Sequence, residues 1–511
     1  MLVLDACRDW PAAAEWTAPV ERGDTSAGAE RTPALPALAA SFGDDRVCIA
    51  SCGDRYFSDQ KREDSTVGAY AAEWVGGICD SFSSSSSLAT NGAGVKYLKD
   101  WRLFDLHPES ERSYRVPPAF VDDWLNAHWP GTERDRTGGD FRFVYVGPRG
   151  SWTPLHRDVF RSYSWSANVC GTKQWLLFPP AVSAMLLNQR GDCPYDVLDV
   201  DAVDRTEFPR FDEAMRRCIR VQQPAGSAIF VPAAWFHQVS NATDCLSINH
   251  NWGNAHNVDL MWNHVIDELV LVEAALDHLR PRRCTCAPRV ALGGRIARLH
   301  WPPPLWEREH ADVSLPLHPD ELGGDEANSG NSEADNVGPE SGHFCDECIE
   351  WLLTCQRVLK ASCGASIAQF VTFLRACARH LISIDFRKSL DGEHGDAADS
   401  VHATGAMAAA ERKSAMANIE FGLGKLGDLL RIAARELRHV LDAVAAEVDK
   451  ADQENAAEAG SETPGTTETL PPTESSSPVV CDPAIDPGAD ADAALIARIE
   501  AKRSELQIEL R

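Results

Sequence analysis

Two histidines and one aspartate have the residue types and the spacing of a metal site. His156 and Asp158, separated by one residue, lie in segment 141–180, which is rich in aromatic and β-branched residues and is predicted to form strands. His237 follows a second strand-like segment. Two imidazoles and one carboxylate are the ligand set of mononuclear non-heme Fe(II) oxygenases, which leaves coordination positions open. The sequence therefore predicts an Fe(II) site at His156, Asp158 and His237.

Strand geometry explains how these three side chains could meet. Residues i and i+2 of a strand face the same side, so His156 and Asp158 could bind one ion from a single strand end. A β-barrel then brings His237 to the same place from another strand. The alternative is chance, because the chain has 16 histidines and His237 could be a surface residue at a strand end. The turn-forming sequence GPRGSWTP before the pair favours the metal site.

Longer motifs surround these residues: GSWTPLHRDVFRSYSWSANVCGTKQWLLFPP, FVPAAWFHQVSNATDCLSINHNW, YLKDWRL and FVDDWLNAHW. They resemble the jumonji-C family of 2-oxoglutarate-dependent oxygenases, and within it a small branch of protein hydroxylases. The resemblance extends over residues 40–280 and has a fainter continuation around residues 343–381. It implies a mainly β fold, a double-stranded β-helix (jelly-roll or cupin) barrel with flanking helices and a helical C-terminal region.

The resemblance also assigns residues to the 2-oxoglutarate pocket. Lys173, in the strand-like GTKQWLLF, matches the lysine that binds the distal carboxylate, and Thr153 and Asn249 match neighbouring positions. Ser166 and Tyr145 are further candidates for the lining of the pocket. A lysine in a core strand is costly to bury unless it meets an anion, which favours the same role for Lys173 over an outward-facing lysine on an edge strand.

The activity implied by the resemblance is hydroxylation of a protein side chain, with Fe(II) as cofactor and 2-oxoglutarate and O2 as co-substrates. The implied target is a lysine carbon of the eukaryotic translation termination (release) factor. Arg157 stands between the two ligands where relatives carry a small residue, and it leaves the identity of the substrate open. Two alternatives are a jumonji-class histone lysine demethylase and a cupin-type module that binds a partner without turnover.

Composition limits the remaining possibilities. The net charge of −27 and the pI of about 5.0 argue against a general binder of nucleic acid or of membrane surfaces. The first residues lack the pattern of a signal peptide, and no window reaches 18 apolar residues without charge. The 16 cysteines, scattered along the chain, are typical of reduced thiols. We therefore expect a cytoplasmic protein, with the nucleus as the other compartment.

The predicted domain organisation follows changes in composition. We expect a flexible leader (1–40), the oxygenase domain (41–280), an acidic linker (303–342), a helical region (344–448), a disordered tract (450–490) and a terminal helix (491–511). The serine run 83–87 is expected to be a surface loop. Apolar helix faces after the barrel must pack on the barrel or on a second subunit, so a homodimer is an open expectation.

Four cysteines offer a second metal hypothesis. Cys284 and Cys286 could combine with Cys345 and Cys348 into a zinc site. The second pair has the pattern of a helix, and a linker separates the two pairs. Thiols on a helix face are therefore the preferred interpretation.

Overall fold

The computed structural model describes residues 1–20, 30–76, 94–130, 140–282, 345–384, 401–438 and 489–510. These residues belong to two compact units. The first unit contains residues 1–261, and the second begins at Trp262, inside a long helix. The main segment of the first unit thus starts and ends earlier than the predicted boundaries at residues 41 and 280.

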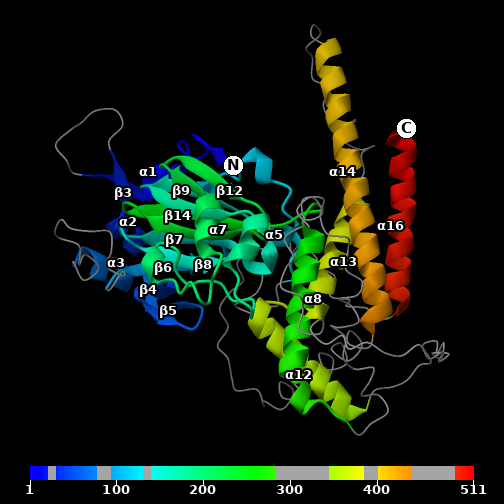
Figure 1. The fold of residues 1–511 in the computed structure, drawn as a ribbon. Helices are drawn as coiled ribbons and strands as arrows, with labels where there is room; N and C mark the ends of the chain where they lie inside the picture. The colour runs from blue at the N-terminus through cyan, green and yellow to red at the C-terminus, as the bar shows by residue number, and fades with distance from the viewer. Residues whose placement is uncertain are drawn as a thin grey trace, which may run out of the picture. The chain divides into compact units, whose positions relative to one another are not determined.

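Two antiparallel sheets form the barrel of the first unit (Figure 1). The larger sheet has the strand order β1 (Leu2–Val3), β12 (Ser227–Val231), β9 (Tyr163–Cys170), β14 (Cys245–Trp252), β7 (Arg142–Gly147), β6 (Lys96–Trp101), β4 (Arg46–Tyr56) and β5 (Asp59–Thr66). The smaller has the order β11 (Ile219–Gln223), β10 (Lys173–Phe178), β13 (Phe236–Asn241) and β8 (Trp152–His156). A separate pair joins β2 (Thr17–Pro19) to β3 (Arg31–Pro33).

Short helices surround these sheets in the first unit. The α-helices are α1 (Pro11–Glu15), α2 (Leu35–Phe42), α3 (Val67–Val75), α4 (Leu103–Leu106), α5 (Trp124–His128), α6 (Pro180–Ser183) and α7 (Phe211–Arg217). Short 3-10 helices are η1 (Pro108–Ser113), η2 (Pro118–Phe120), η3 (Val159–Arg161), η4 (Ala184–Leu186), η5 (Val200–Ala202) and, beyond the first unit, η6 (Asp277–Leu279). The two-sheet architecture confirms the predicted jelly-roll core.

Alternation along the strands separates an outer core from the lumen of the barrel. In β7, Val144 and Val146 are buried in the core on the outer face, whereas Phe143 and Tyr145 point the other way and remain partly accessible. Apolar side chains from both sheets meet at one end of the lumen, where Trp175 of β10 packs with Ile229 of β12. The lumen is therefore closed by packing at one place and lined by polar and aromatic groups elsewhere.

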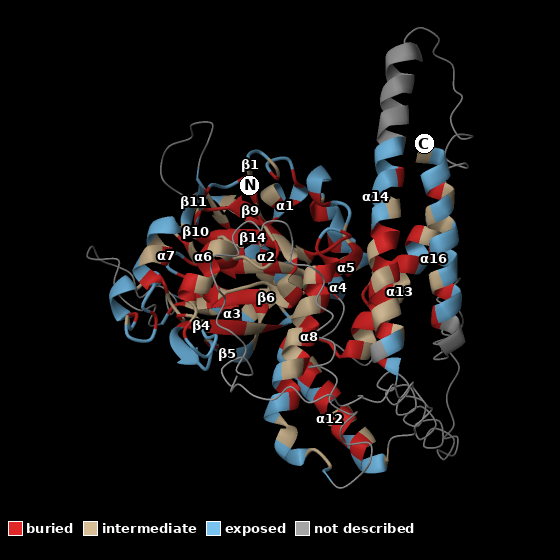
Figure 2. Cartoon of the chain, turned by 45° about the vertical axis from the view of Figure 1, so that its right-hand side comes forward, coloured by how far each residue is buried: buried red, intermediate tan, exposed pale blue. Residues whose placement is uncertain are grey.

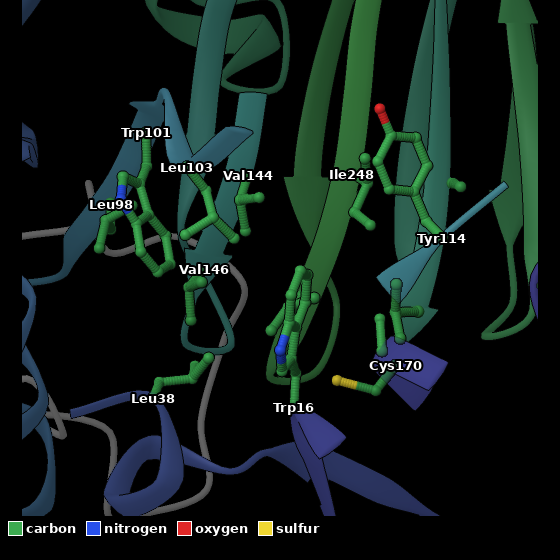
Figure 3. Packing of buried hydrophobic residues seen from close by; sticks show 14 of the residues in the cluster. Trp16, Leu38, Leu98, Trp101, Leu103, Tyr114, Val144, Val146, Cys170 and Ile248 are labelled. Carbon is green, nitrogen blue, oxygen red and sulfur yellow. The ribbon is translucent and has the colours of Figure 1, made fainter. Parts of the chain in front are cut away.

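The outer core is completed by N-terminal residues, which corrects the prediction of a flexible leader for residues 1–20 and 30–40, the part of the predicted segment that the structure describes. Trp10 and Trp16 are buried in the same cluster as Leu98 and Val146 of the larger sheet, and Figure 3 shows Trp16 among these residues. The strand β1 pairs with β12 and covers the edge of that sheet. The composition of this segment is rich in Ala, Pro and charge, yet its two tryptophans supply enough apolar surface to order it.

The second unit consists of helices. They are α8 (Val258–Ala275), of which residues from Trp262 belong to this unit, and α12 (Asp346–Cys363), α13 (Ile367–Ser383), α14 (Val401–Glu436) and α16 (Ala489–Leu510). Ser366 and Gln369 form a capping box at the start of α13, and Gly364, with a φ of 91°, ends α12. Figure 2 shows the buried stripes along α12, α13 and α14.

These helices agree with the helical patterns predicted for residues 344–448 and 491–511 where the structure describes them. Predicted segments 83–87 and 303–342, most of 450–490, and Cys284 with Cys286 lie outside the described residues. Cys345 caps α12 and Cys348 is buried within it. Of the helices that the structure describes, none is long and apolar enough to cross a membrane.

A buried ion pair joins α13 to the terminal helix and gives a stability prediction. Arg375 Nε and Nη2 donate to the two carboxylate oxygens of Asp492 at 2.7 and 2.6 Å. Asp492→Ala should lower the free energy of unfolding by about 3 kcal/mol or more, because it leaves a buried guanidinium unpaired. Glu500→Ala changes another residue of α16 and removes an exposed partner of Arg431 in α14. This change should lower the free energy of unfolding by at most about 1 kcal/mol. Denaturant unfolding followed by circular dichroism measures both; equal losses would contradict the prediction.

Candidate metal centre

The three predicted ligands lie together at one end of the lumen. His156 ends β8, His237 lies in β13, and the two residues are cross-strand partners whose ring centroids are 4.2 Å apart. Asp158 Oδ2 is 3.9 Å from His237 Nε2, and one potential ligand atom from each residue lies within 4.8 Å of the others. In the described part of the chain this is the one group of at least three His, Cys, Asp or Glu residues with such geometry.

Backbone carbonyls orient both imidazoles. His156 Nδ1 lies 2.8 Å from the carbonyl oxygen of Pro154, and His237 Nδ1 lies 3.2 Å from that of Trp235. A carbonyl only accepts, so each Nδ1 carries a hydrogen and each Nε2 is the ring nitrogen left for a metal. Burial, reinforced by His237 and partly offset by Asp158, lowers the pKa of His156 to about 4. His156 is therefore neutral at physiological pH, the state in which an imidazole can bind a metal.

Asp158 reaches the site from a loop. The strand β8 stops at His156, so the rule that i and i+2 share a face of a strand does not by itself place this carboxylate. Instead Asp158 precedes η3, in which Phe160 adopts a φ of 54° and is completely buried against Trp129. Ser164 Oγ donates to Asp158 Oδ2 at 2.7 Å. The buried anchor and this hydrogen bond together hold the carboxylate toward the two histidines.

Arg157, between the two candidate ligands in the sequence, contacts Phe236 instead of joining them. Its guanidinium carbon lies 4.1 Å from the centroid of the Phe236 ring, in a cation–π contact. The large residue between the two ligands thus occupies the surface beside them and leaves their ligand atoms clear.

Lys173 lies deep in the lumen. It is 2 % exposed and pairs across the ladder with Asn241. Its Nζ donates to Asn241 Oδ1 at 3.0 Å and to the Tyr97 hydroxyl at 3.1 Å. Both partners are neutral, and among the described residues no carboxylate lies within ion-pair distance of this ammonium group. A buried cation without a counter-ion fits the binding of an anion.

Two residues at this place were missed by the sequence interpretation. Tyr97 and Asn241 both lie within motifs used for the resemblance, YLKDWRL and FVPAAWFHQVSN, but neither was singled out. Their pairing with Lys173 depends on strands far apart in the chain. Gly147 makes the approach of Tyr97 possible, because a Cβ at that position would lie 2.4 Å from the tyrosine ring.

Tyr145, predicted to line the cofactor pocket, has a different hydrogen-bond partner. Its ring faces the lumen, 6.0 Å from that of Tyr97, but its hydroxyl donates to Asp100 Oδ1 at 2.7 Å. The structure therefore directs the Tyr145 hydroxyl to Asp100 and the Tyr97 hydroxyl to Lys173.

A bulge in β8 places Thr153 on the same face of the sheet as the candidate ligands His156 and His237. His156 pairs with His237 and Thr153 with Val239, so three steps along β8 match two along β13. Residues three apart in a regular strand face opposite sides, whereas here Thr153 shares the face of His156. Asn249 pairs with Ser166 across β14 and β9. The Ser166 hydroxyl and Asn168 Oδ1 are buried and have no hydrogen-bond partner among the described residues, so the lumen holds polar groups suited to a ligand.

The two-sheet fold and this centre agree with a known class of protein. The family model of the Cupin-like domain matches residues 1–257, half of the chain, and the chain belongs to that family. The match begins at the first residue, in agreement with the packing of the N-terminal segment onto the barrel.

Particular relatives within this class include jumonji proteins. The chain is 40% identical over 245 residues to the 2-oxoglutarate and iron-dependent oxygenase JMJD4 of Gallus gallus, covering 48% of this chain and 55% of the relative. It is 37% identical over 271 residues to JMJD4 of Homo sapiens, covering 53% and 60%. It is 39% identical over 293 residues to the Arginine-specific demethylase JMJ20 of Arabidopsis thaliana, covering 55% and 58%. The resemblance to jumonji-C proteins is thus confirmed, and the chain spans little more than half the length of these relatives.

Proposed function

We propose that this chain is an Fe(II)- and 2-oxoglutarate-dependent oxygenase that acts on a protein side chain. The observation that carries the proposal is the combination of two features in one lumen. A triad of two imidazoles and a carboxylate lies at its mouth, and deeper inside lies a buried ammonium group that has no carboxylate partner among the described residues. The names of the JMJD4 relatives support the same pair of cofactor and co-substrate.

The triad residues would hold the metal through His156 Nε2, His237 Nε2 and an Asp158 oxygen. Bound there, Fe(II) would supply activation of O2, coupled to conversion of 2-oxoglutarate into succinate and CO2. Three protein ligands leave room for the co-substrate. The protein contributes position rather than acid–base chemistry: Pro154 and Trp235 carbonyls set the imidazoles, and Ser164 sets the carboxylate.

Lys173 would bind the distal carboxylate of 2-oxoglutarate, with Tyr97 and Asn241 holding the ammonium group in place. Asn241 is itself fixed, because its Nδ2 donates to Ser151 Oγ at 2.8 Å. Thr153, Ser166 and Asn249 supply polar groups along the same lumen. The partly accessible rings of Phe143 and Tyr145 would form the aromatic wall beside a bound substrate.

We further propose carbon hydroxylation of a lysine in the translation termination factor as the reaction. The support is the resemblance of the motifs to the branch of protein hydroxylases that includes the JMJD4 relatives. A cytoplasmic location suits that partner and agrees with 16 cysteines that are scattered along the chain. A homodimer remains a proposal of the same kind.

Demethylation is the second candidate, favoured by the similarity to the demethylase JMJ20. Oxidation of an N-methyl carbon uses the same metal and co-substrate, so the site itself accommodates both reactions. The difference lies in the side chain presented. Two kinds of peptide would separate the two reactions. One is a termination-factor peptide that contains the target lysine, and the other is a set of histone peptides that carry a methylated lysine or a methylated arginine.

The experiment measures succinate and peptide mass together. Purified full-length chain is incubated with Fe(II), 2-oxoglutarate and each peptide. We expect succinate release that requires both Fe(II) and 2-oxoglutarate, and a termination-factor peptide that gains one oxygen atom. Loss of a methyl group from a histone peptide would establish demethylation instead. Absence of succinate formation with every peptide and without peptide would favour a binding module.

The two lumen tyrosines provide a matched prediction. Tyr97→Phe should raise the KM for 2-oxoglutarate by roughly five- to tenfold, because the loss of one hydrogen bond to Lys173 costs about 1 kcal/mol. Tyr145→Phe, which removes the bond to Asp100, should leave that KM nearly unchanged. Succinate formation at varied 2-oxoglutarate concentration measures both. A larger effect from Tyr145→Phe would mean that the hydroxyl of Tyr145, a predicted residue of the pocket lining, contacts the co-substrate.

A further inference from the structure

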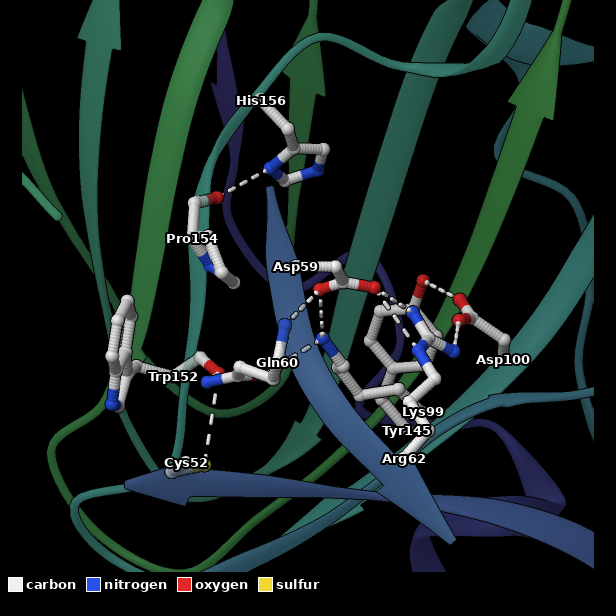
Figure 4. A network of polar contacts seen from close by, with 10 residues as sticks. All are labelled: Cys52, Asp59, Gln60, Arg62, Lys99, Asp100, Tyr145, Trp152, Pro154 and His156. Carbon is white, nitrogen blue, oxygen red and sulfur yellow. Dashed lines mark hydrogen bonds and ion pairs between the residues drawn. The ribbon is translucent and has the colours of Figure 1, made fainter. Parts of the chain in front are cut away.

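The metal-bearing strand β8 lies at a seam between the two sheets. It is the last strand of the smaller sheet and pairs with β13, while β5 is the last strand of the larger sheet and pairs with β4. A side chain bridges these two edges. Gln60 of β5 is 1 % exposed, and its Nε2 donates to the carbonyl oxygen of Trp152 in β8 at 3.0 Å (Figure 4). The bridge therefore satisfies a backbone group on the side of β8 that faces away from β13.

Lys99 holds the other end of this amide. Its Nζ donates to Gln60 Oε1 at 3.0 Å, and Lys99 is 3 % exposed. The hydrogen bond fixes which end of the amide is oxygen, so that the NH2 group must face Trp152. A chain of two hydrogen bonds thus runs from Lys99 of β6 through Gln60 of β5 to Trp152 of β8, the strand that ends at His156 (Figure 4).

A bulge in β6 directs Lys99 and the next residue inward. Leu98 pairs with Val146 and Trp101 with Val144, so three steps along β6 match two along β7. Leu98 and Trp101 both lie in the outer core. Between them Asp100 takes a φ of 58°, uncommon for a residue with a side chain, and turns its carboxylate to Tyr145. Local strain of this kind is maintained only where the surroundings require it.

The surrounding charges stabilise the buried ammonium group. Lys99 Nζ is 3.8 Å from Asp59 Oδ1, and Arg62 contacts both Asp59 and Asp100, at 2.9 and 2.6 Å. Two cations and two carboxylates therefore balance one another at the seam. Because an isolated buried charge is costly, this balance keeps Lys99 available to orient Gln60.

The metal-bearing strand needs such a support. Between Trp152 and His156 lies the bulge that disturbs its ladder with β13. On the opposite edge of β8, the Leu155 N–H donates to the Tyr195 carbonyl oxygen at 3.1 Å near the end of the strand, and Gln60 holds Trp152 at its start. We propose that Gln60, oriented by Lys99, is a positioning residue that fixes β8 and thereby sets the spacing of His156 relative to Asp158 and His237. The inference rests on the proposed function, since it assumes that these three residues bind a metal.

The test uses Co(II) as a spectroscopic probe of the full-length chain. Gln60→Glu keeps the shape and the acceptor for Lys99 but removes the N–H donor to Trp152; Gln60→Leu removes both bonds. Both variants should bind Co(II) roughly 10- to 100-fold more weakly than the unmodified chain, the usual effect of losing a residue that orients ligands. The visible absorption bands of bound Co(II) should also change shape, which a loss of stability alone would not produce.

Tyr70→Phe is the matched control. The Tyr70 hydroxyl donates to the carbonyl oxygen of Val146 at 2.9 Å on the outer face of the larger sheet. The variant therefore also loses a buried hydrogen bond from a side chain to a strand carbonyl. It should lower the melting temperature without changing Co(II) affinity. Unchanged affinity and spectrum in both Gln60 variants would overturn the positioning role. If the unmodified chain fails to bind Co(II), or binds it equally well after His156→Ala, the metal site itself is wrong.

Discussion

Replacing His156, Asp158 or His237 by alanine should abolish 2-oxoglutarate turnover while leaving the chain folded. Each residue would supply one of three protein ligands, so each substitution would remove one bond between the protein and the metal. The expected fall is to the background of the assay, at least about a thousandfold. The side chains lie at the mouth of the lumen and not in the hydrophobic clusters, so the melting temperature should change little. Succinate formation and thermal unfolding are the two measurements.

An exposed histidine provides the control for these variants. His278→Ala changes a residue of η6 in the second unit and should leave turnover intact. Near-normal turnover in any of the three triad variants would show that the ligand assignment is wrong. A variant that loses turnover together with its folded state decides nothing alone, and for that case His156→Gln and His237→Gln keep the volume of the side chain and lose the imidazole.

Removing the charge of Lys173 should raise the KM for 2-oxoglutarate far more than it changes the affinity for the metal. A charge-assisted hydrogen bond in a buried site contributes about 2–4 kcal/mol, which corresponds to roughly 30- to 1,000-fold in KM. Lys173→Met keeps the apolar stem that packs in the lumen and removes only the ammonium group. Kinetics at varied 2-oxoglutarate, together with a Co(II) titration, separate the two effects.

Lys96 is the appropriate comparison, because it lies on a barrel strand but on the outside. Its ammonium group pairs with Glu63 and Glu73, which are themselves partly exposed. Lys96→Met should therefore cost at most about 1 kcal/mol of stability and leave the KM for 2-oxoglutarate unchanged. A KM that is the same in Lys173→Met and in the unmodified chain would exclude the proposed role of Lys173.

The chemistry of the centre was accessible from the sequence because it resides in residue types and short motifs. His156, Asp158, His237 and Lys173 stand within long motifs, and a buried lysine in a core strand already calls for an anion. The alternation of β7 and the helical periodicity of α12 to α16 are likewise local properties, so strands and helices could be expected near their observed positions.

The partners of these residues were decided by tertiary structure. Tyr97 reaches Lys173 from a strand 76 positions earlier in the chain, and Gln60 reaches Trp152 across 92 positions. Pairings between such distant residues depend on sheet register. A single bulged residue moves the following side chains to the opposite face of the sheet, as it does for Thr153. The local sequence pattern does not predict such a bulge.

The N-terminal residues show the same limit in another form. Composition indicated a leader without structure, because propensity counts the residues of a segment and not the surface that the segment can cover. Trp10 and Trp16 gain their stability only from an apolar sheet face built by later strands. The sequence alone thus determined which groups could carry out the chemistry. The tertiary structure decided which of them meet, because each meeting depends on burial and strand register contributed by distant parts of the chain.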